Sequence, residues 1–343
     1  MKTLHLSSKN IDIAAQILKR GGLVAIPTET VYGLAASAYN IEAIKNIYLA
    51  KGRPSDNPLI VHIDSIENIF DVVSEFPENA QKLAQAFWPG PITVILPKND
   101  KIPPEVCAGM DSVAVRMPLH PIAREIIKKS GLPLVAPSAN LSGKPSPTSF
   151  EHVAEDLDGK IDAIVDGGRC SVGVESTVVS LCGDVPKILR PGAITAQDIQ
   201  NVLGNVLIDD SVCNKLKPDQ KVLSPGVKYK HYAPSTPVVM LKGGVEEYAC
   251  FVNGKKHENI AALCLDEDIA LLEVPYISYG SVNSTGLQEQ QIFSALRRVD
   301  ELNAKTVYAH FCGEVDSNLA VYNRLIRAAA FNITDLSGNK GGK

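Results

Sequence analysis

Along the first part of the chain, short runs of apolar residues alternate with stretches in which apolar residues recur every three or four positions. The runs are typical of buried strands, and the stretches are typical of amphipathic helices. Residues 11–18 predict the first helix, which Asn10 can cap and which the pair Gly21-Gly22 ends. Strands are expected at 23–28, 59–63, 92–97, 112–118, 132–137 and 163–168. The alternation predicts an α/β fold.

The connections indicate a twisted, mixed sheet rather than a purely parallel one. Only a loop with prolines and glycines separates ITVILP (92–97) from SVAVRMP (112–118), and only Cys182-Gly183-Asp184 separates VESTVVSL from PKILRP. Antiparallel neighbours need no more than a short loop, whereas parallel neighbours need a long crossover, usually a helix. Some neighbouring strands are therefore expected to be antiparallel.

A second, smaller domain is expected after a proline-containing polar stretch. Residues 205–237, which include the string SPGVKYKHYAP, follow a helix predicted near 195–203 and are expected to form a linker. Beyond it, three apolar runs alternate with three helical stretches, which predicts a Rossmann-like α/β domain. The expected organisation is a first domain at 1–204, the linker at 205–237, a second domain at 238–335 and a disordered tail at 336–343.

Composition and charge limit the classes of function. The 45% of hydrophobic residues, 21% of charged residues and mean hydropathy of +0.03 suit globular cores and exclude wholesale disorder. The net charge is −4, and residues 1–205 contain 19 Lys and Arg against 22 Asp and Glu, so RNA binding would require locally gathered cations. The seven cysteines form no C-x-x-C pair, which argues against a zinc site. Without an apolar run of signal-peptide or membrane-span length, we expect a cytoplasmic protein with no membrane contact.

The polar residues of greatest interest lie where predicted strands end. The chain has no G-x-x-x-x-G-K-[ST] motif for nucleotides, no G-x-S-x-G motif and no H-E-x-x-H motif. Polar groups instead occur in the strings PTETVYGL (27–34), KGRPSDNPL (51–59), PSAN (137–140), EST (175–177) and RPG (190–192). Loops at strand ends often carry function, and five such groups together indicate a pocket.

Each group also has a purely structural interpretation. Residues 28–30 could form an N-capping turn that opens a helix, and residues 51–53 could simply end one. His62, alone in an apolar strand, could be an ordinary core residue. Arg116 is more informative, because a buried arginine needs an anionic partner, and a substrate carboxylate or phosphate would suit it.

Taken in order, the strings PTETVYGL, KGRPSDNPL, APSANLSGKPSPT, VESTVV and ILRPG resemble the L-threonylcarbamoyladenylate synthase family, the YrdC-like enzymes. SPGVKYKHYAP resembles the linker of its longer, two-domain members. The resemblance implies a nucleotidyltransferase that joins L-threonine, bicarbonate and ATP, with Mg²⁺, into threonylcarbamoyl adenylate and releases pyrophosphate. The product would supply the threonylcarbamoyl group to a downstream transferase machinery that modifies an adenosine in tRNA, and a direct tRNA contact is compatible with this.

The resemblance also implies which residues form the site. Catalysis would rest on positioning and electrostatics, with Lys51 and Arg53 as the catalytic charge carriers, and Thr30 and His62 would recognise the threonine hydroxyl. No carboxylate cage for magnesium is evident. The threonine side would comprise Thr30, His62, Arg116, Ala136 and Ser176, and the nucleotide side Arg53, Asn57, Ser112, Ser138, Asn140, Ser146, Arg190 and Tyr232.

Two sequence departures and two alternative functions remain. Ser180 stands where the family often has an acidic residue, and Val227 where a methionine is common. One alternative is an RNA-binding module without catalysis, which would require a stripe of positive charge across an open face. The other is the carbamoyl-transfer chemistry of hydrogenase maturation proteins, which resemble this domain but carry paired cysteines that this chain lacks.

Overall fold

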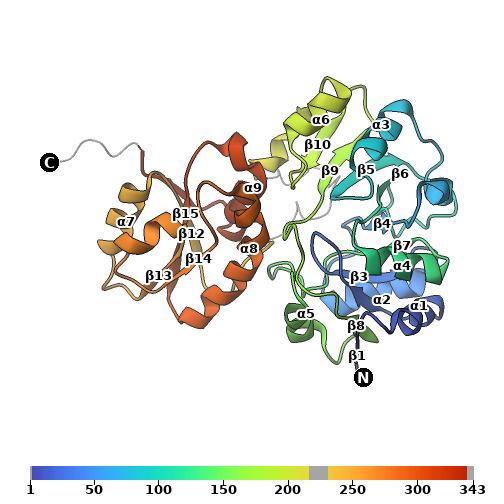
Figure 1. Ribbon diagram of the computed structural model, residues 1–343, viewed down its shortest axis with the longest axis horizontal. Coiled ribbons are helices and arrows are strands. Elements are labelled where there is room, and N and C mark those ends of the chain that lie inside the picture. The colour runs from blue at the N-terminus through green and yellow to red at the C-terminus, as the bar shows by residue number, and fades with distance from the viewer. Residues whose placement is uncertain (1, 216–230, 338–343) are drawn as a thin grey trace. The chain divides into compact units, whose positions relative to one another are not determined.

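The computed structural model describes residues 2–215 and 231–337 (Figure 1). The described residues form two compact units: the first comprises 2–142 and 146–212, and the second comprises 143–145, 213–215 and 231–337. Most of the SPGVKYKHYAP string, Val227 included, and residues 338–343 of the expected tail lie outside the described residues.

The first unit is built on a mixed, twisted sheet, as the sequence predicted. Its strand order is β1-β8-β2-β3-β7-β4-β6-β5-β9-β10-β11. Parallel pairs such as β4 with β6 alternate with antiparallel pairs such as β5 with β6 and β9 with β10. The strands are β1 Leu4–Leu6, β2 Val24–Ile26, β3 Gly33–Ser37, β4 Ile60–His62, β5 Ile92–Pro97, β6 Ser112–Arg116, β7 Leu134–Val135, β8 Ala163–Val165, β9 Thr177–Ser180, β10 Lys187–Arg190 and β11 Leu207–Ile208.

Helices cover this sheet. α1 and α4 pack against each other, as do α3 and α6. The helices of the unit are α1 Ile11–Lys19, α2 Ile41–Lys51, α3 Glu78–Phe87, α4 Pro121–Ser130, α5 Phe150–Leu157 and α6 Ala196–Leu203, with short 3-10 turns η1 Ile66–Asp71 and η2 Asp210–Val212.

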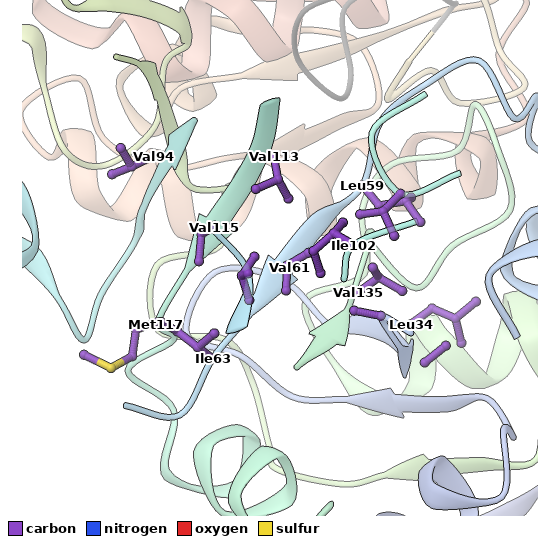
Figure 2. Packing of buried hydrophobic residues seen from close by; sticks show 14 of the residues in the cluster. Leu34, Leu59, Val61, Ile63, Val94, Ile102, Val113, Val115, Met117 and Val135 are labelled. Carbon is purple, nitrogen blue, oxygen red and sulfur yellow. The ribbon is translucent and has the colours of Figure 1, made fainter. Parts of the chain in front are cut away.

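The central strands are buried on both faces. Val113 and Val115 of β6 belong to the main core, where Figure 2 shows them near Val61 of β4. Ala114, which points to the opposite face, packs with Ile60 in a second, smaller cluster. Because both faces of these strands are covered, polar side chains gather at the strand ends. This burial explains why the candidate functional groups in the sequence lie there.

Two details of the first unit differ from the sequence predictions. Asn10 precedes α1, but its Oδ1 accepts hydrogen bonds from the backbone N–H and the hydroxyl of Ser7, at 3.2 and 2.9 Å, and not from the helix. The linker begins later than expected, because β11 pairs in parallel with β10 and Val212 is buried. The sequence does not reveal β11, because the strand has only two residues, Leu207 and Ile208, and two aspartates follow it, as in a polar linker.

The second unit is a Rossmann-like parallel sheet, also as predicted. Its strand order is β14-β13-β15-β12-β16, and α7 lies on one side of the sheet with α8 and α9 on the other (Figure 1). Within the described parts of both units, no helix is both long and apolar enough to cross a membrane. The elements are β12 Val238–Lys242, α7 Val245–Asn253, β13 Ile260–Cys264, η3 Asp266–Leu271, β14 Tyr276–Ser278, α8 Thr285–Arg298, η4 Val299–Leu302, β15 Thr306–Phe311, η5 Val315–Asn318, α9 Leu319–Ala328 and β16 Ile333–Asp335.

The edges of this second sheet were not predicted. β14 and β16 are three-residue edge strands with exposed side chains such as Tyr276 and Ile333, so they lack the apolar run of a buried strand. The expected tail at 336–343 was also placed too early. Leu336 is buried against Leu241 and Tyr248, and its backbone N–H donates to the carbonyl of Lys242.

The packing of the first unit predicts a contrast between two leucines. Leu34 of β3 is fully buried in the main core, whereas Leu49 of α2 is 76% exposed. We expect Leu34→Ala to lower the free energy of unfolding of this unit by about 2–5 kcal/mol, because it leaves a cavity. Leu49→Ala should change it by less than about 0.5 kcal/mol. Denaturant unfolding of both variants measures this difference, and equal effects would contradict the described core.

Candidate functional site

Two neighbouring strands of the central sheet, β4 and β6, each end with a polar residue. β4 and β6 are parallel, with Ile60 opposite Ala114 and His62 opposite Arg116. The last residue of each strand is therefore a neighbour of the other, on the same face of the sheet. Both side chains are almost completely buried, with 2% of His62 and 4% of Arg116 exposed. A buried cation and an imidazole thus stand side by side at the carboxyl ends of these strands.

Arg116 is held by the loop that follows β2. Its NH2 donates to Oε1 of Glu29 at 2.6 Å, and its NH1 donates to the hydroxyl of Thr30 at 2.8 Å. Its Nε donates to the carbonyl of Gly90 at 3.3 Å. The guanidinium has five N–H groups, and its contacts with the described residues leave two of them for another acceptor. The anion expected for this arginine is thus supplied, at least in part, by Glu29 of the protein itself.

The carboxyl group of Glu29 is ionised in this environment. Its side chain is 3% exposed. Burial by itself would raise the pKa of the group, but the charge of Arg116 and the hydrogen bond from it outweigh burial, and the pKa lies below its usual value. The result is a buried ion pair that links β6 to the PTET segment.

Thr28 shapes the PTET segment from within. Its hydroxyl donates to the carbonyl of Val31 at 2.6 Å and lies 2.9 Å from the hydroxyl of Thr30. The backbone N–H of Thr30 donates back to Thr28 Oγ1 at 3.2 Å. The chain then enters strand β3 at Gly33, so the structural interpretation as a turn that opens a helix is wrong.

His62 is a neutral imidazole. Burial, together with the nearby charge of Arg116, lowers its pKa to about 3. Its Nδ1 lies 3.2 Å from the carbonyl oxygen of Ile60, which can only accept, so this nitrogen carries the proton. The other ring nitrogen, Nε2, is then an acceptor, which suits a donor such as a hydroxyl group.

A second polar cluster lies at the start of β9. The hydroxyls of Ser176 and Thr93 are 2.7 Å apart, and Arg190 donates to Oγ and to the carbonyl of Ser176, at 3.1 Å in each case. Gly192 packs so closely here that a Cβ at that position would lie 2.5 Å from the carbonyl oxygen of Glu175. This contact explains the glycine of the RPG string.

Lys51 binds backbone rather than an open space. Its ammonium donates to the carbonyls of Ser138 and Asn140, the latter at 2.6 Å, and lies 3.5 Å from Oδ1 of Asn140. Its side chain is 3% exposed, and its own carbonyl accepts from the N–H of Ser142. Lys51 therefore fixes the loop after β7, and all three of its N–H groups have protein acceptors.

Asn57 is a fully buried amide whose side chain has no partner. Neither its Oδ1 nor its Nδ2 forms a hydrogen bond within the described ranges. Its carbonyl accepts from the hydroxyl of Tyr48 at 3.1 Å, and Arg53 donates to the neighbouring carbonyl of Pro58 at 3.3 Å. A buried amide with both polar atoms unpaired is typical of a ligand contact.

The strand register divides the predicted site residues into two groups. Ser112 begins β6 and Arg116 ends it, so they lie about 13 Å apart at ~3.3 Å per residue. Asn57 precedes β4, which is parallel to β6, and residues 138–140 follow β7, which is antiparallel to β4. All of these lie toward the Ser112 end. One group is thus Asn57, Ser112, Ser138 and Asn140, and the other is His62, Arg116 and Ser176. Thr30 belongs with the second group through its hydrogen bond with Arg116, although the register brings the following Gly33 beside Ser138.

Four of the predicted site residues do not lie in the group that their expected role would give them. Arg190 and Ser146, expected on the nucleotide side, lie with the second group, since Arg190 binds Ser176 and the Ser146 hydroxyl donates to Glu175 at 2.5 Å. Ala136 lies between the groups and donates its N–H to Ile60. Tyr232 packs within the second unit, with its ring 5.0 Å from that of Phe293.

Sequence reasoning left three polar residues of this site out of the predicted set. Glu29 and Glu175 stand inside the quoted strings PTETVYGL and VESTVV, and Thr93 is a hydroxyl within the apolar run ITVILP. A buried carboxylate beside a buried arginine could have been inferred from charge balance. The contact between Thr93 and Ser176 depends on the pairing of β5 with β9, which the sequence does not specify.

A metal cage is absent from residues 2–215 and 231–337. No group of three or more His, Cys, Asp or Glu side chains there could hold a metal ion. A metal bound only by the protein therefore does not fit the described residues.

The chain is similar to one enzyme family along nearly its whole length. Residues 16–192 match the family of Sua5, YciO and YrdC described as "Telomere recombination", and residues 194–330 match the one described as "Threonylcarbamoyl-AMP synthase, C-terminal domain". The threonylcarbamoyl-AMP synthase of Bacillus subtilis is 44% identical over 330 residues, which cover 95% of this chain and 94% of that protein. That of Pyrococcus abyssi is 44% identical over 332 residues, covering 94% and 95%.

Solved structures agree with this similarity. The crystal structure of P. abyssi Sua5 complexed with L-threonine matches with a TM-score of 0.87 at 40% identity and covers 98% of this chain and 99% of that one. E. coli YciO matches with a TM-score of 0.51 at 22% identity, covering 56% of this chain and 97% of that one, which shows a shared fold for the first unit.

The lowered pKa of His62 predicts how stability depends on pH. The unfolded chain protonates His62 near its ordinary value of 6.5, whereas the folded chain does so only near 3. Stability is therefore full above pH 6.5 and falls between these values as pH decreases, by up to about 1.4 kcal/mol per pH unit. Denaturant unfolding of His62→Gln should lack this component between pH 6 and 4. A variant that follows the wild-type slope would contradict a buried, neutral His62.

The contacts of Lys51 predict that its substitution weakens nucleotide binding by a factor that does not depend on the number of phosphates. If Lys51 fixes the loop after β7, Lys51→Met should weaken the binding of AMP and ATP that the sequence resemblance implies by the same factor, roughly tenfold, because buried carbonyls lose their donor. The salt dependence of ATP binding should not change. Arg53→Ala is the comparison, and it should weaken ATP more than AMP, with a shallower salt dependence. Calorimetric titrations at two salt concentrations test this, and a larger loss for ATP in Lys51→Met would show that Lys51 binds phosphate.

Proposed function

Because the chain belongs to the threonylcarbamoyl-AMP synthase family, we propose that it is a nucleotidyltransferase that makes threonylcarbamoyl-AMP from L-threonine, bicarbonate and ATP. The observation that carries the proposal is the buried cluster of Thr30, His62 and Arg116 at the ends of β4 and β6. A relative of nearly the same length and fold is solved with L-threonine. This similarity favours the enzyme over an RNA-binding module without catalysis.

The cluster at the strand ends suits an amino acid with a hydroxyl group. The two remaining N–H groups of Arg116 can bind the carboxylate as a bidentate pair. Nε2 of the neutral His62 can accept a hydrogen bond from the threonine hydroxyl. A buried acceptor of this kind rejects valine, which has a methyl group in place of the hydroxyl, because the acceptor would be left unpaired.

The nucleotide is proposed to lie toward the opposite ends of these strands. The unpaired amide of Asn57 and the loop residues Ser138 and Asn140 offer donors and acceptors there, and Arg53 offers charge. Magnesium enters as part of the ATP substrate, bound to its phosphates, since the described residues form no cage for it. The separation of about 13 Å along β6 keeps the α-carboxylate apart from the nucleotide base.

The reaction needs placement more than a covalent nucleophile. Threonine in its ammonium form and bicarbonate give a carbamate, with loss of one water and one proton. A carbamate oxygen then bonds to the α-phosphorus of ATP as the bond to the β-phosphate breaks and pyrophosphate leaves. Holding the carbamate beside that phosphorus and neutralising charge on the leaving group are contributions that positioned N–H groups and cations can make.

The product is a mixed anhydride of a carbamate and a phosphate, which water destroys readily. It must therefore be consumed by a transferase that moves the threonylcarbamoyl group to an adenosine of tRNA. We propose that this activity takes place in the cytoplasm. Direct contact between this chain and tRNA is compatible with the proposed function.

Pyrophosphate release tests the proposed function. The full chain is incubated with Mg²⁺-ATP and bicarbonate, with threonine, serine, valine or no amino acid. We expect release that requires both threonine and bicarbonate, falls by roughly tenfold or more in Arg53→Ala because a phosphate contact is lost, and persists in Arg20→Ala, which alters an exposed arginine. If threonine stimulates no release at any bicarbonate concentration, the proposed function is wrong.

A further inference from the structure

One oxygen of the buried Glu29 carboxylate lacks a donor. Oε1 accepts from Arg116 at 2.6 Å, but Oε2 receives no hydrogen bond from any residue in the described parts of the chain. The backbone N–H groups of Leu119 and of Glu29 itself also help to lower the pKa of this carboxyl group, but no hydrogen bond from the described residues reaches Oε2. A buried charged acceptor left unpaired costs more free energy than a neutral one, because it loses stronger hydrogen bonds to water. Such a group is typical of a site whose partner arrives with a ligand.

The geometry argues against Glu29 serving only as the counter-ion of Arg116. Carboxylates that neutralise arginine often do so with both oxygens, in a bidentate pair that is stronger and better defined. Glu29 uses one oxygen, and the other N–H groups of Arg116 go to Thr30 and Gly90 or remain available. Among the described residues, Glu29 thus keeps an unpaired acceptor, Oε2, and Arg116 keeps unpaired N–H donors.

These unused groups match the two charges of an α-amino acid. We propose that Oε2 of Glu29 accepts a hydrogen bond from the α-amino group of the substrate while the two remaining N–H groups of Arg116 bind its carboxylate. The ion pair would then recognise the zwitterion as a unit, with opposite charges facing each other. This inference rests on the proposed function and adds a specificity residue that the predicted set lacks.

A surface depression lies beside the segments that follow β4 and β6. Leu119, whose amide lies beside the carboxyl group, is 52% exposed and lines a surface depression together with Asp64 and Arg124. Asp64 and Leu119 follow closely after the strand-end residues His62 and Arg116. Glu29, His62 and Arg116 themselves do not line this depression, which adjoins the segments that carry them.

The contact can persist through carbamate formation. The ammonium nitrogen has three N–H groups, and the carbamate that forms from it retains one. That remaining N–H can still donate to Oε2. Glu29 would thus hold the nitrogen in one place while the carbon of bicarbonate becomes bonded to it, which is a contribution to orientation.

A ligand without the amino group separates recognition from structural support. The dissociation constants of L-threonine and of (R)-3-hydroxybutanoate, which keeps the carboxylate and the hydroxyl, are measured by calorimetry on the full chain. We expect Glu29→Gln to weaken L-threonine binding roughly 10- to 100-fold, as for a hydrogen bond to a charged group. Binding of (R)-3-hydroxybutanoate should change by less than about threefold, because this ligand has no amino group for Oε2 of Glu29 to bind.

Two further variants serve as controls. Glu175→Gln alters another buried carboxylate of the site, one that accepts from Ser146, and should affect both ligands alike. Glu29→Asp keeps the charge, so it should bind L-threonine more tightly than Glu29→Gln does, and it replaces that variant if Glu29→Gln does not fold.

Three outcomes would overturn the inference. Equal weakening of both ligands by the Glu29 variants would make the residue a structural counter-ion of Arg116, and no weakening of threonine binding would remove it from the site. In either case wild-type threonine binding and threonine-dependent pyrophosphate release would still support the proposed function. If the wild-type chain binds no threonine and releases no pyrophosphate with it, the proposed function fails, and the inference fails with it.

Discussion

The buried ion pair between Arg116 and Glu29 is the interaction on which the rest of the site depends. It joins the end of a central strand to a loop 87 residues earlier in the chain, and both side chains are at most 4% exposed. Removing one partner of such a pair leaves an uncompensated buried charge, which typically costs 3–5 kcal/mol. Hydrophobic residues would fill the same space at lower cost in desolvation. A pair kept here is therefore best explained by what its unused donors and acceptor bind.

Charged residues elsewhere in the site serve mainly to hold the loops in position. Lys51 donates to two carbonyls of the loop after β7, and Arg190 donates to the backbone and hydroxyl of Ser176. Lys51 thereby connects α2 to a loop that no strand pairing holds, whereas Arg190 reinforces the antiparallel pairing of β9 with β10. Because both faces of the central strands are buried, these loops are the places where polar groups can meet a substrate. The contacts of Lys51 and Arg190 thus hold these polar loops in fixed positions.

The sequence predicted the fold class and most of the elements, but it was less reliable about boundaries and partners. Long apolar runs such as 92–97 and 112–118 identified buried strands, whereas β11, β14 and β16 are too short or too exposed for such a pattern. The resemblance named residues that the structure gathers at the strand ends. The sequence could not show that Glu29 pairs with Arg116, because that contact depends on how β2, β4 and β6 are arranged in the sheet. The assignment of each residue to the threonine or the nucleotide side remains a prediction.

The ion pair between Glu29 and Arg116 is expected to keep its geometry when the substrate is bound. A crystal structure of the full chain with L-threonine tests it most directly. We predict that the pair between Glu29 and Arg116 stays intact, that the carboxylate of threonine binds the two remaining N–H groups of Arg116, and that its nitrogen lies about 2.7–3.2 Å from Oε2 of Glu29. A broken pair, or an amino group that faces another part of the site, would contradict this account.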